Sequence, residues 1–115
     1  MDEVNSPKLI TCFLPRGRGL PLIKILHEEK GLVTGNVATG RGTGTAGTTR
    51  HGTWIEVDVF DVMVSGDRAD EIFKFIYEKA KIGEIDNGFM VQSRLSRSTT
   101  FSLPEIEEKS SEDQA

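Results

Sequence analysis

The sequence predicts a single α+β domain, with two helices on one face of a four-stranded antiparallel sheet. Residues 53–64 alternate between apolar and polar side chains, which is typical of a strand. Two other segments carry apolar residues at helical spacing, and the segments follow one another in the order β-α-β-β-α-β. That order is the split arrangement of ferredoxin-like folds. The length of 115 residues fits one such domain.

The first half supplies three of the elements. Residues 8–14 form a short apolar run closed by Pro15, which indicates a buried strand. Pro21 suits the first turn of a helix expected over residues 20–30 and ended by Gly31. The apolar face of this helix comprises Leu22, Ile23, Leu26 and Ile25. Residues 32–39 are expected to form a weaker strand, interrupted by Gly35.

The second half supplies the other three. In the strand expected over residues 53–64, Glu56 and Asp58 fall on one face and β-branched residues on the other. Ser65 or Asp67 is expected to cap a helix that ends at Gly83. Its apolar positions are Ala69, Ile72, Phe73, Ile76 and Ala80. Residues 89–95 are expected to form the last strand.

One face of this sheet would have no helix on it. Glu56 and Asp58 give way to Phe60 and Val62 along the same face of their strand, so we expect the uncovered face to be partly apolar. Packing of several sheets around a symmetry axis would bury it, and we expect a homotrimer.

Composition excludes several classes of protein. The formal charge of −4 arises entirely from the segment after residue 102, which contains five acidic residues and one lysine. Residues 104–115 are expected to be a disordered tail. The rest of the chain is close to neutral, so nucleic-acid binding is not expected. Cys12 is the only cysteine and is expected to be buried and inert. Because no apolar run reaches the length of a membrane span and the first residues lack a signal-peptide pattern, we expect a cytoplasmic protein.

The most unusual segment is residues 35–52, which hold six of the twelve glycines. Within it, Gly42, Gly44 and Gly47 match the spacing of a dinucleotide fingerprint, but a strand follows where that fingerprint requires a helix. A hairpin tip without a ligand is the plain alternative. Arg41 stands between Gly40 and Gly42, and a second glycine-bounded loop precedes the last strand, so glycine amides and arginines together could hold phosphates.

The order, spacing and motifs of residues 8–101 resemble the PII signal-transduction proteins, trimeric ferredoxin-like sensors of adenine nucleotides. Residues 1–103 would form this domain. The segment from Gly40 to Gly42 resembles the G-x-G at the start of the family's T-loop, which would span about residues 41–52 and be flexible. The segment IGEIDNG resembles the family's B-loop.

The resemblance implies an adenine nucleotide, ADP, AMP or ATP, bound in the clefts between subunits with or without Mg²⁺. Asp61 would lie on a strand beside that cleft. The residues implied in nucleotide binding are Gly40, Arg41, Gly42, Asp61, Gly83, Glu84, Ile85, Asp86, Asn87, Gly88, Phe89, Arg94 and Arg97.

Several positions depart from the family pattern, and all concern the phosphates. Asp86 replaces a glycine of the B-loop, Phe89 replaces its lysine, and Val57 stands where another phosphate-binding lysine is expected. Charge-assisted hydrogen bonds contribute about 1.5–3 kcal/mol each, so their loss favours a ligand with fewer phosphates than ATP. Arg41, Arg50 or Arg94 would then have to supply the missing positive charge.

Three functions remain open. In the first, a regulatory trimer binds the nucleotide and acts through its T-loop on a membrane transporter or metabolic enzyme, with an anion such as bicarbonate as co-ligand. In the second, the protein is a nucleotide-independent trimeric interaction module or a CutA-like metal-related protein. In the third, it is a small hydrolase that uses Asp61 or Asp86. No nucleophile, base and orienting group stand together in the sequence, so we do not expect an enzyme.

Overall fold

The computed structural model describes residues 1–42, 55–84 and 87–101. Their elements, in chain order, are β1 (Lys8–Pro15), α1 (Gly19–Lys30), β2 (Asn36–Gly42), β3 (Ile55–Val64), the short 3₁₀ helix η1 (Gly66–Arg68), α2 (Ala69–Lys79) and β4 (Phe89–Arg94). The predicted β-α-β-β-α-β order is therefore confirmed. Most of the predicted T-loop, residues 43–52, and the predicted acidic tail lie outside the described residues.

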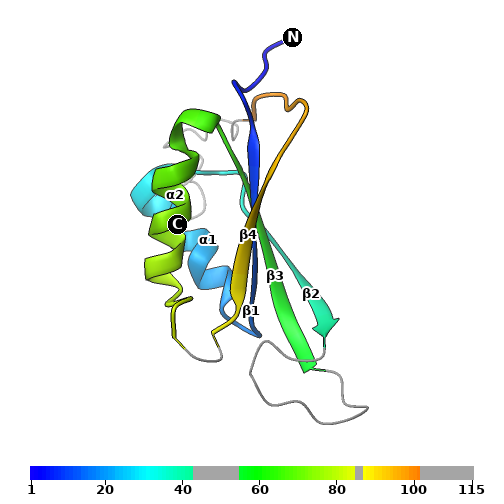
Figure 1. Ribbon diagram of the computed structural model, residues 1–115, viewed down its shortest axis with the longest axis vertical. Helices are drawn as coiled ribbons and strands as arrows, with labels where there is room; N and C mark the ends of the chain where they lie inside the picture. The colour runs from blue at the N-terminus through cyan, green and yellow to red at the C-terminus, as the bar shows by residue number, and fades with distance from the viewer. Residues whose placement is uncertain (43–54, 85–86, 102–115) are drawn as a thin grey trace, which may run out of the picture.

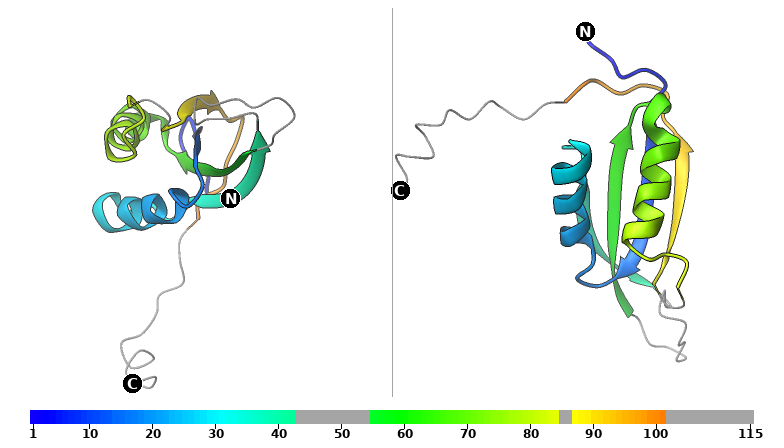
Figure 2. Two further views of the ribbon diagram at one scale, coloured as in Figure 1. Left: turned by 90° about the horizontal axis from the view of Figure 1, so that it is seen from below. Right: turned by 90° about the vertical axis from the view of Figure 1, so that its left-hand side faces the viewer.

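The four strands form one antiparallel sheet in the order β2-β3-β1-β4. Strand β1, the first in the chain, lies in the interior, where Cys12 pairs with Phe60 of β3 on one side and with Met90 of β4 on the other. Strands β2 and β4 are the two edges. Both helices lie on the same face of the sheet, as predicted, and no helix among the described residues lies on the opposite face (Figures 1 and 2).

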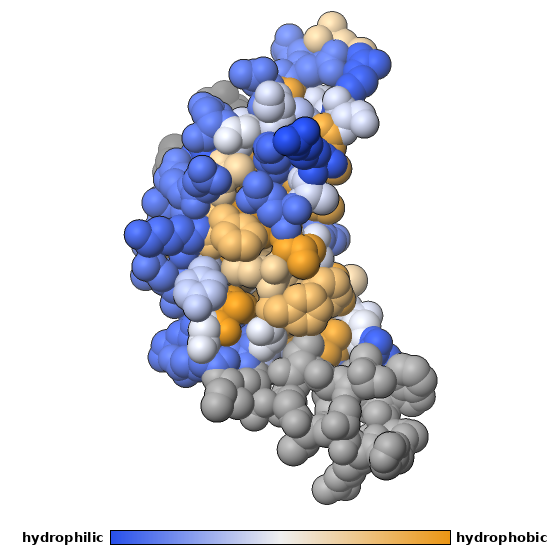
Figure 3. Space-filling view, viewed as in Figure 1, coloured by the Kyte–Doolittle hydropathy of each residue, from blue (hydrophilic) through white to orange (hydrophobic). Residues whose placement is uncertain are grey.

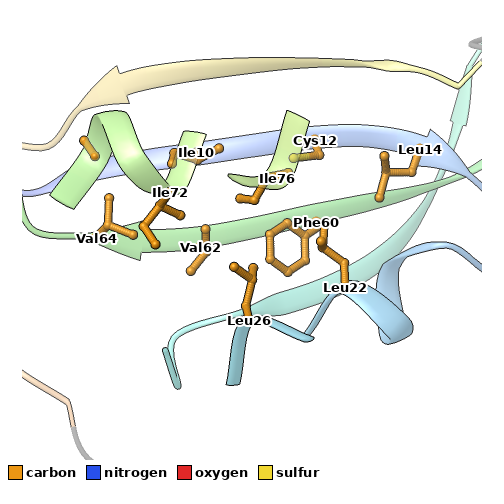
Figure 4. Packing of buried hydrophobic residues seen from close by; sticks show 11 residues of the cluster. Ile10, Cys12, Leu14, Leu22, Leu26, Phe60, Val62, Val64, Ile72 and Ile76 are labelled. Carbon is orange, nitrogen blue, oxygen red and sulfur yellow. The ribbon is translucent and has the colours of Figure 1, made fainter. Parts of the chain in front are cut away.

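The core lies between the sheet and the two helices (Figure 4). Phe60, at the centre of β3, is fully buried between side chains of α1 and α2. The apolar residues of this buried cluster are Ile10, Cys12 and Leu14 of β1, Leu22 and Leu26 of α1, Phe60, Val62 and Val64 of β3, and Ala69, Ile72 and Ile76 of α2. The helical spacing predicted the inward face of α2 correctly. On α1, Leu22, Leu26 and Ile23 pack in or against the core as predicted, whereas Ile25 does not belong to it.

Gly31 ends α1 as predicted. It adopts a left-handed conformation with φ of 68°, and its N–H donates to the carbonyl of His27. The next N–H, of Leu32, donates to the carbonyl of Leu26. These two hydrogen bonds satisfy carbonyls that the helix itself cannot pair. None of the described helices has the length and apolar character required to span a membrane.

Two predicted boundaries and one predicted helix cap were wrong. Residues 32–35 are not a strand: β2 begins at Asn36 and continues to Gly42, while the hydroxyl of Thr34 donates to the carbonyl of Met63 at 2.6 Å. Helix α2 ends at Lys79, before Gly83, because the chain turns through Lys81, which has φ of 55°. Neither Ser65 nor Asp67 caps the backbone of η1 or α2, because the Ser65 hydroxyl donates to the Asp67 carboxylate instead.

The assignment of faces to β3 was also wrong. The face that carries Asp58 and Phe60 is the one that packs against the helices, and the uncovered face carries Val57, Val59, Asp61 and Met63. Asp58 is only 5% exposed, although its charge suggested a solvent-facing position. Its carboxylate accepts hydrogen bonds from two backbone N–H groups at the start of α1, which explains how a charge is accommodated there.

Candidate functional site

The G-x-G of the predicted T-loop lies at the end of the edge strand β2. Gly40 pairs with Val57 and Gly42 with Ile55 of β3. A side-chain carbon at position 40 would approach Val59 to 3.3 Å, so a side chain there would have little room above the uncovered face. Val57, which occupies the position of an expected lysine, is 4% exposed.

The predicted B-loop connects α2 to β4 and is held by its own hydrogen bonds. The side chain of Asn87 donates to the carbonyl of Lys81 at 3.0 Å, and the N–H of Glu84 donates to the same carbonyl at 3.0 Å. Gly83 lies against the Tyr77 hydroxyl, which a side-chain carbon at position 83 would approach to 2.4 Å. Two predicted site residues, Ile85 and Asp86, lie outside the described residues.

Gly88 closes this loop against β1. Its φ of 97° lies in a region that favours glycine, and a side-chain carbon would lie 1.9 Å from the carbonyl oxygen of Phe13. The next residue, Phe89, stacks on Phe13 with ring centroids 4.7 Å apart. Gly88 therefore allows the close backbone approach from which β4 begins.

Asp61 lies in the middle of the uncovered face, where it accepts a hydrogen bond of 2.6 Å from the Thr11 hydroxyl. It pairs with Asn36 of β2 and Thr11 of β1 in the sheet. Asp61 is two residues farther along β3 than Val59, the residue that lies near Gly40.

The same carboxylate influences Cys12, which is buried as predicted. Burial, with a smaller contribution from the negative charge of Asp61, raises the pKa of the Cys12 thiol from its ordinary 9.0 to about 12. The folded protein thus favours the protonated thiol, and because only thiolates attack electrophiles, Cys12 is expected to be unreactive while the protein is folded.

This pKa predicts a loss of stability in alkali. Below the ordinary pKa the stabilisation is fully present, and it decreases as the pH rises through 9 toward 12, because the unfolded chain releases the proton first. We expect the free energy of unfolding to fall by about 1 kcal/mol between about pH 9 and about pH 10 through this group alone. Urea unfolding of the native chain and of Cys12→Ala at both pH values measures this change. If the free energy of unfolding fell equally in the two proteins between the two pH values, the prediction would be contradicted.

Arg94 and Arg97 lie at the other end of β4. Arg94 is five residues beyond Phe89, or roughly 17 Å along an extended strand. Arg97 follows the strand and forms a bidentate ion pair with Glu3, with N–O distances of 3.0 and 2.8 Å. This pairing lowers the pKa of Glu3 and raises that of Arg97.

The predicted site residues therefore fall into separate groups within one chain. The G-x-G on β2 and the B-loop before β4 lie at the same end of the sheet, the lower end in Figure 1, but on opposite edges. Strands β3 and β1 lie between them, which corresponds to roughly 14 Å at three strand spacings. Arg94 and Arg97 lie at the upper end, so one chain does not bring all these residues together.

Sequence reasoning missed the role of Asp58. It also missed Glu3, the partner of Arg97, and Lys8, which pairs with Arg94 in the sheet. Asp58 holds the turn between β1 and α1, because its carboxylate accepts hydrogen bonds of 2.9 Å from the N–H groups of both Gly17 and Gly19. In the same turn, the Arg16 guanidinium forms an ion pair with Glu56. Asp58 lies on the same face of β3 as Phe60 and Val62, and this shared face was the available signal for its burial.

The fold and the two glycine segments define the class of the protein as a ferredoxin-like α+β domain with loops at one end of its sheet. No family model matches the sequence, and no curated protein matches it either. Among solved structures, the chain is similar to the crystal structure of Arabidopsis thaliana PII bound to citrate, with a TM-score of 0.65 and 18% identity. The match covers 80% of this chain and 79% of the PII chain, and it shows that the two share a fold.

Proposed function

We propose that this protein is a PII-like regulator that binds an adenine nucleotide between the subunits of a homotrimer and acts on a transporter or metabolic enzyme. The action would pass through the loop that follows Gly42. The observation that carries the proposal is the position of the two glycine segments, at the same end of the sheet and on its two opposite edges.

Opposite edges require a second subunit. Strands β1 and β3 separate the G-x-G from the B-loop within one chain, so a small ligand could contact both only if the β2 edge of one subunit lies beside the β4 edge of another. Such a contact joins two different surfaces, and its repetition around a threefold axis closes a ring. A trimer of this kind would contain three equivalent clefts.

The uncovered sheet face supports assembly. Phe89 and Val91 of β4 are 51% and 46% exposed, and both belong to this face. Figure 3 shows apolar side chains gathered over the middle of the view, where β4 forms the near edge of the sheet. Large exposed apolar groups that lie together mark interaction sites, and packing against neighbouring sheets would remove them from water.

The groups near these glycines suit a ligand with few phosphates. Backbone N–H groups and Arg41 can donate to phosphate oxygens, whereas Glu84, Asn87 and Phe89 bring no positive charge. We therefore favour ADP or AMP over ATP. The structurally similar PII protein is bound to citrate, an organic anion, which supports an anion such as bicarbonate as a co-ligand.

The metal-related alternative gains no support from the described residues, among which no three His, Cys, Asp or Glu side chains lie together as a metal site would require. The interaction module that needs no nucleotide remains as an outcome of the test.

Light scattering and calorimetry test the proposal on the full chain. The mass should be that of a trimer, and titration with AMP, ADP, ATP and cyclic AMP, with and without Mg²⁺ and bicarbonate, should give the strongest binding for a mono- or diphosphate. Gly40→Leu should weaken that binding by about tenfold or more, and light scattering checks that the variant is still a trimer. Thr39→Leu places the same side chain on the opposite face of β2 and serves as the control.

Two results would contradict it. A monomer would remove the inter-subunit cleft. A trimer that binds none of the nucleotides would instead be an interaction module that works without them.

A further inference from the structure

A cavity of about 570 Å³ lies at the upper end of the molecule, away from both glycine segments. Its two walls are the segment before β1 and the segment that follows β4, which Figure 1 shows close together at that end. Clefts of about 300–1,000 Å³ are typical of small-molecule sites. The cavity is therefore large enough for a small organic ligand.

Backbone hydrogen bonds fix both walls. The N–H of Val4 donates to the carbonyl of Ser98 at 2.8 Å, and the N–H of Leu95 donates to the carbonyl of Pro7 at 3.0 Å. Glu3 and Thr99 form an antiparallel bridge beyond them. The first residues of the chain thus continue the pairing between β1 and β4, so the residues that line the cavity are held before any ligand arrives.

The charged side chains in this lining are mainly positive. Lys8, Arg94 and Arg97 contribute three positive charges and Glu3 one negative charge, so the lining carries a net charge of about +2 in a chain whose formal charge is −4. Lys8 and Arg94 are direct cross-strand partners. Like charges in that position repel each other, and a bound anion would offset the repulsion.

Within residues 1–42, 55–84 and 87–101, neither Lys8 nor Arg94 forms an ion pair. Arg97, in contrast, already holds a carboxylate, that of Glu3, through two hydrogen bonds. The planar guanidinium fork binds carboxylate and phosphate in this same bidentate manner. Glu3 therefore occupies the place that a carboxylate or phosphate group of a ligand would take on Arg97.

We propose that this cavity is a second anion site, which binds a small organic dianion bearing carboxylate or phosphate groups, with Glu3 as a built-in competitor for Arg97. One anionic group would lie between Lys8 and Arg94, and the other would exchange with the Glu3 carboxylate. Within one chain the site lies apart from both glycine segments, because Arg94 lies roughly 17 Å along β4 from Phe89.

Calorimetric titration of the full chain at low salt tests the site, with succinate, glycerol phosphate and inorganic phosphate as probes. The two organic dianions should bind. Stronger binding of succinate would indicate a carboxylate site, and stronger binding of glycerol phosphate would indicate a phosphate site. Arg94→Gln and Lys8→Gln should each weaken binding by about tenfold, while Glu3→Gln should strengthen it by roughly threefold or more because Arg97 becomes free. Affinity should fall as salt is added.

Lys24→Gln removes one positive charge from the exposed face of α1, away from the cavity, and should leave the affinity unchanged. An equal loss in this variant, or no binding of any probe at roughly 10 mM, would overturn the proposal. A Glu3→Gln variant that binds more weakly would overturn the role of Glu3 as a competitor. Gly40→Leu distinguishes the two proposals, because it should impair nucleotide binding and leave dianion binding intact.

Discussion

Replacing Gly88 with alanine is expected to lower the free energy of unfolding by about 3 kcal/mol or more. Two costs combine. A φ of 97° strains any residue with a side chain, and the new methyl group would lie 1.9 Å from the carbonyl oxygen of Phe13, which is part of the backbone of β1. Left-handed strain costs about 1–3 kcal/mol, and overpacking costs a similar amount. The start of β4 must therefore move away from β1.

Urea unfolding measures this loss, and Gly17→Ala provides a matched control. Gly17 has almost the same φ, 91°, but a side-chain carbon there would have no atom within 4 Å. The control should therefore report the cost of the backbone conformation alone, about 1–2 kcal/mol. Equal losses in both variants would show that the approach to Phe13 has no energetic consequence. Because Gly88 also belongs to the proposed nucleotide cleft, Gly88→Ala should impair nucleotide binding as well.

Asp58→Ala is expected to destabilise the protein by about 1–3 kcal/mol. The carboxylate is 5% exposed, and it is the acceptor for the N–H groups of Gly17 and Gly19. Its removal leaves both donors without that partner. The N–H of Gly19 is buried and costs about 1–3 kcal/mol if it stays unsatisfied, whereas Gly17 is exposed and water can replace the carboxylate there. The affected residues join β1 to α1, so we expect the amides of Gly17 and Gly19 to lose protection from hydrogen exchange.

Two further variants separate the causes. Asp58→Asn retains a carbonyl oxygen as an acceptor and should cost less than the alanine variant. Glu56→Ala removes an exposed carboxylate from the same strand, one that pairs with Arg16, and should cost less than about 1 kcal/mol. If Asp58→Ala cost no more than Glu56→Ala, the hydrogen bonds at the start of α1 would not be a source of stability.

The sequence predicted the elements well because their signals are local. Alternation identified β3, helical spacing identified the buried faces of α1 and α2, and Gly31 marked the end of α1. Which face of a strand meets the helices is decided elsewhere in the chain, however. Charge suggested that Asp58 faces solvent, but two N–H groups from the turn before α1 provide the partners that allow its burial.

The predicted start of β2 was wrong for a related reason. Residues 32–35 have strand-like composition, yet after Gly31 the chain must first pass from the helix layer to the edge of the sheet. Over that distance Leu32 packs against the core, and the Thr34 side chain, rather than a backbone N–H, bonds the carbonyl of Met63. Backbone pairing begins only where Asn36 reaches Asp61.

The candidate site was predicted as one set of residues, and the structure divides it. A motif shows that glycines and arginines are present, but the edge on which they lie depends on strand order. That order, β2-β3-β1-β4, results from pairings between distant segments, and it places Gly40 and Gly88 on opposite edges. Glu3 and Lys8 were missed because their significance depends on Arg97 and Arg94, which are near them only in the folded sheet.

The interior position of β1 also affects how the protein is made. This apolar strand is synthesised before the other three strands, yet it pairs on one side with β3 and on the other with β4, so that Lys8 meets Val64 and Arg94. Long-range pairings of this kind form slowly, because a large loop must close before any contact compensates for the lost entropy. Residues 8–15 lack any partner strand until β3 has been synthesised, and they lack their second partner until the ribosome has added Arg94, so they are open to association with other nascent chains. Capture of this strand by a chaperone until β4 has been translated is therefore expected to raise the yield of folded protein.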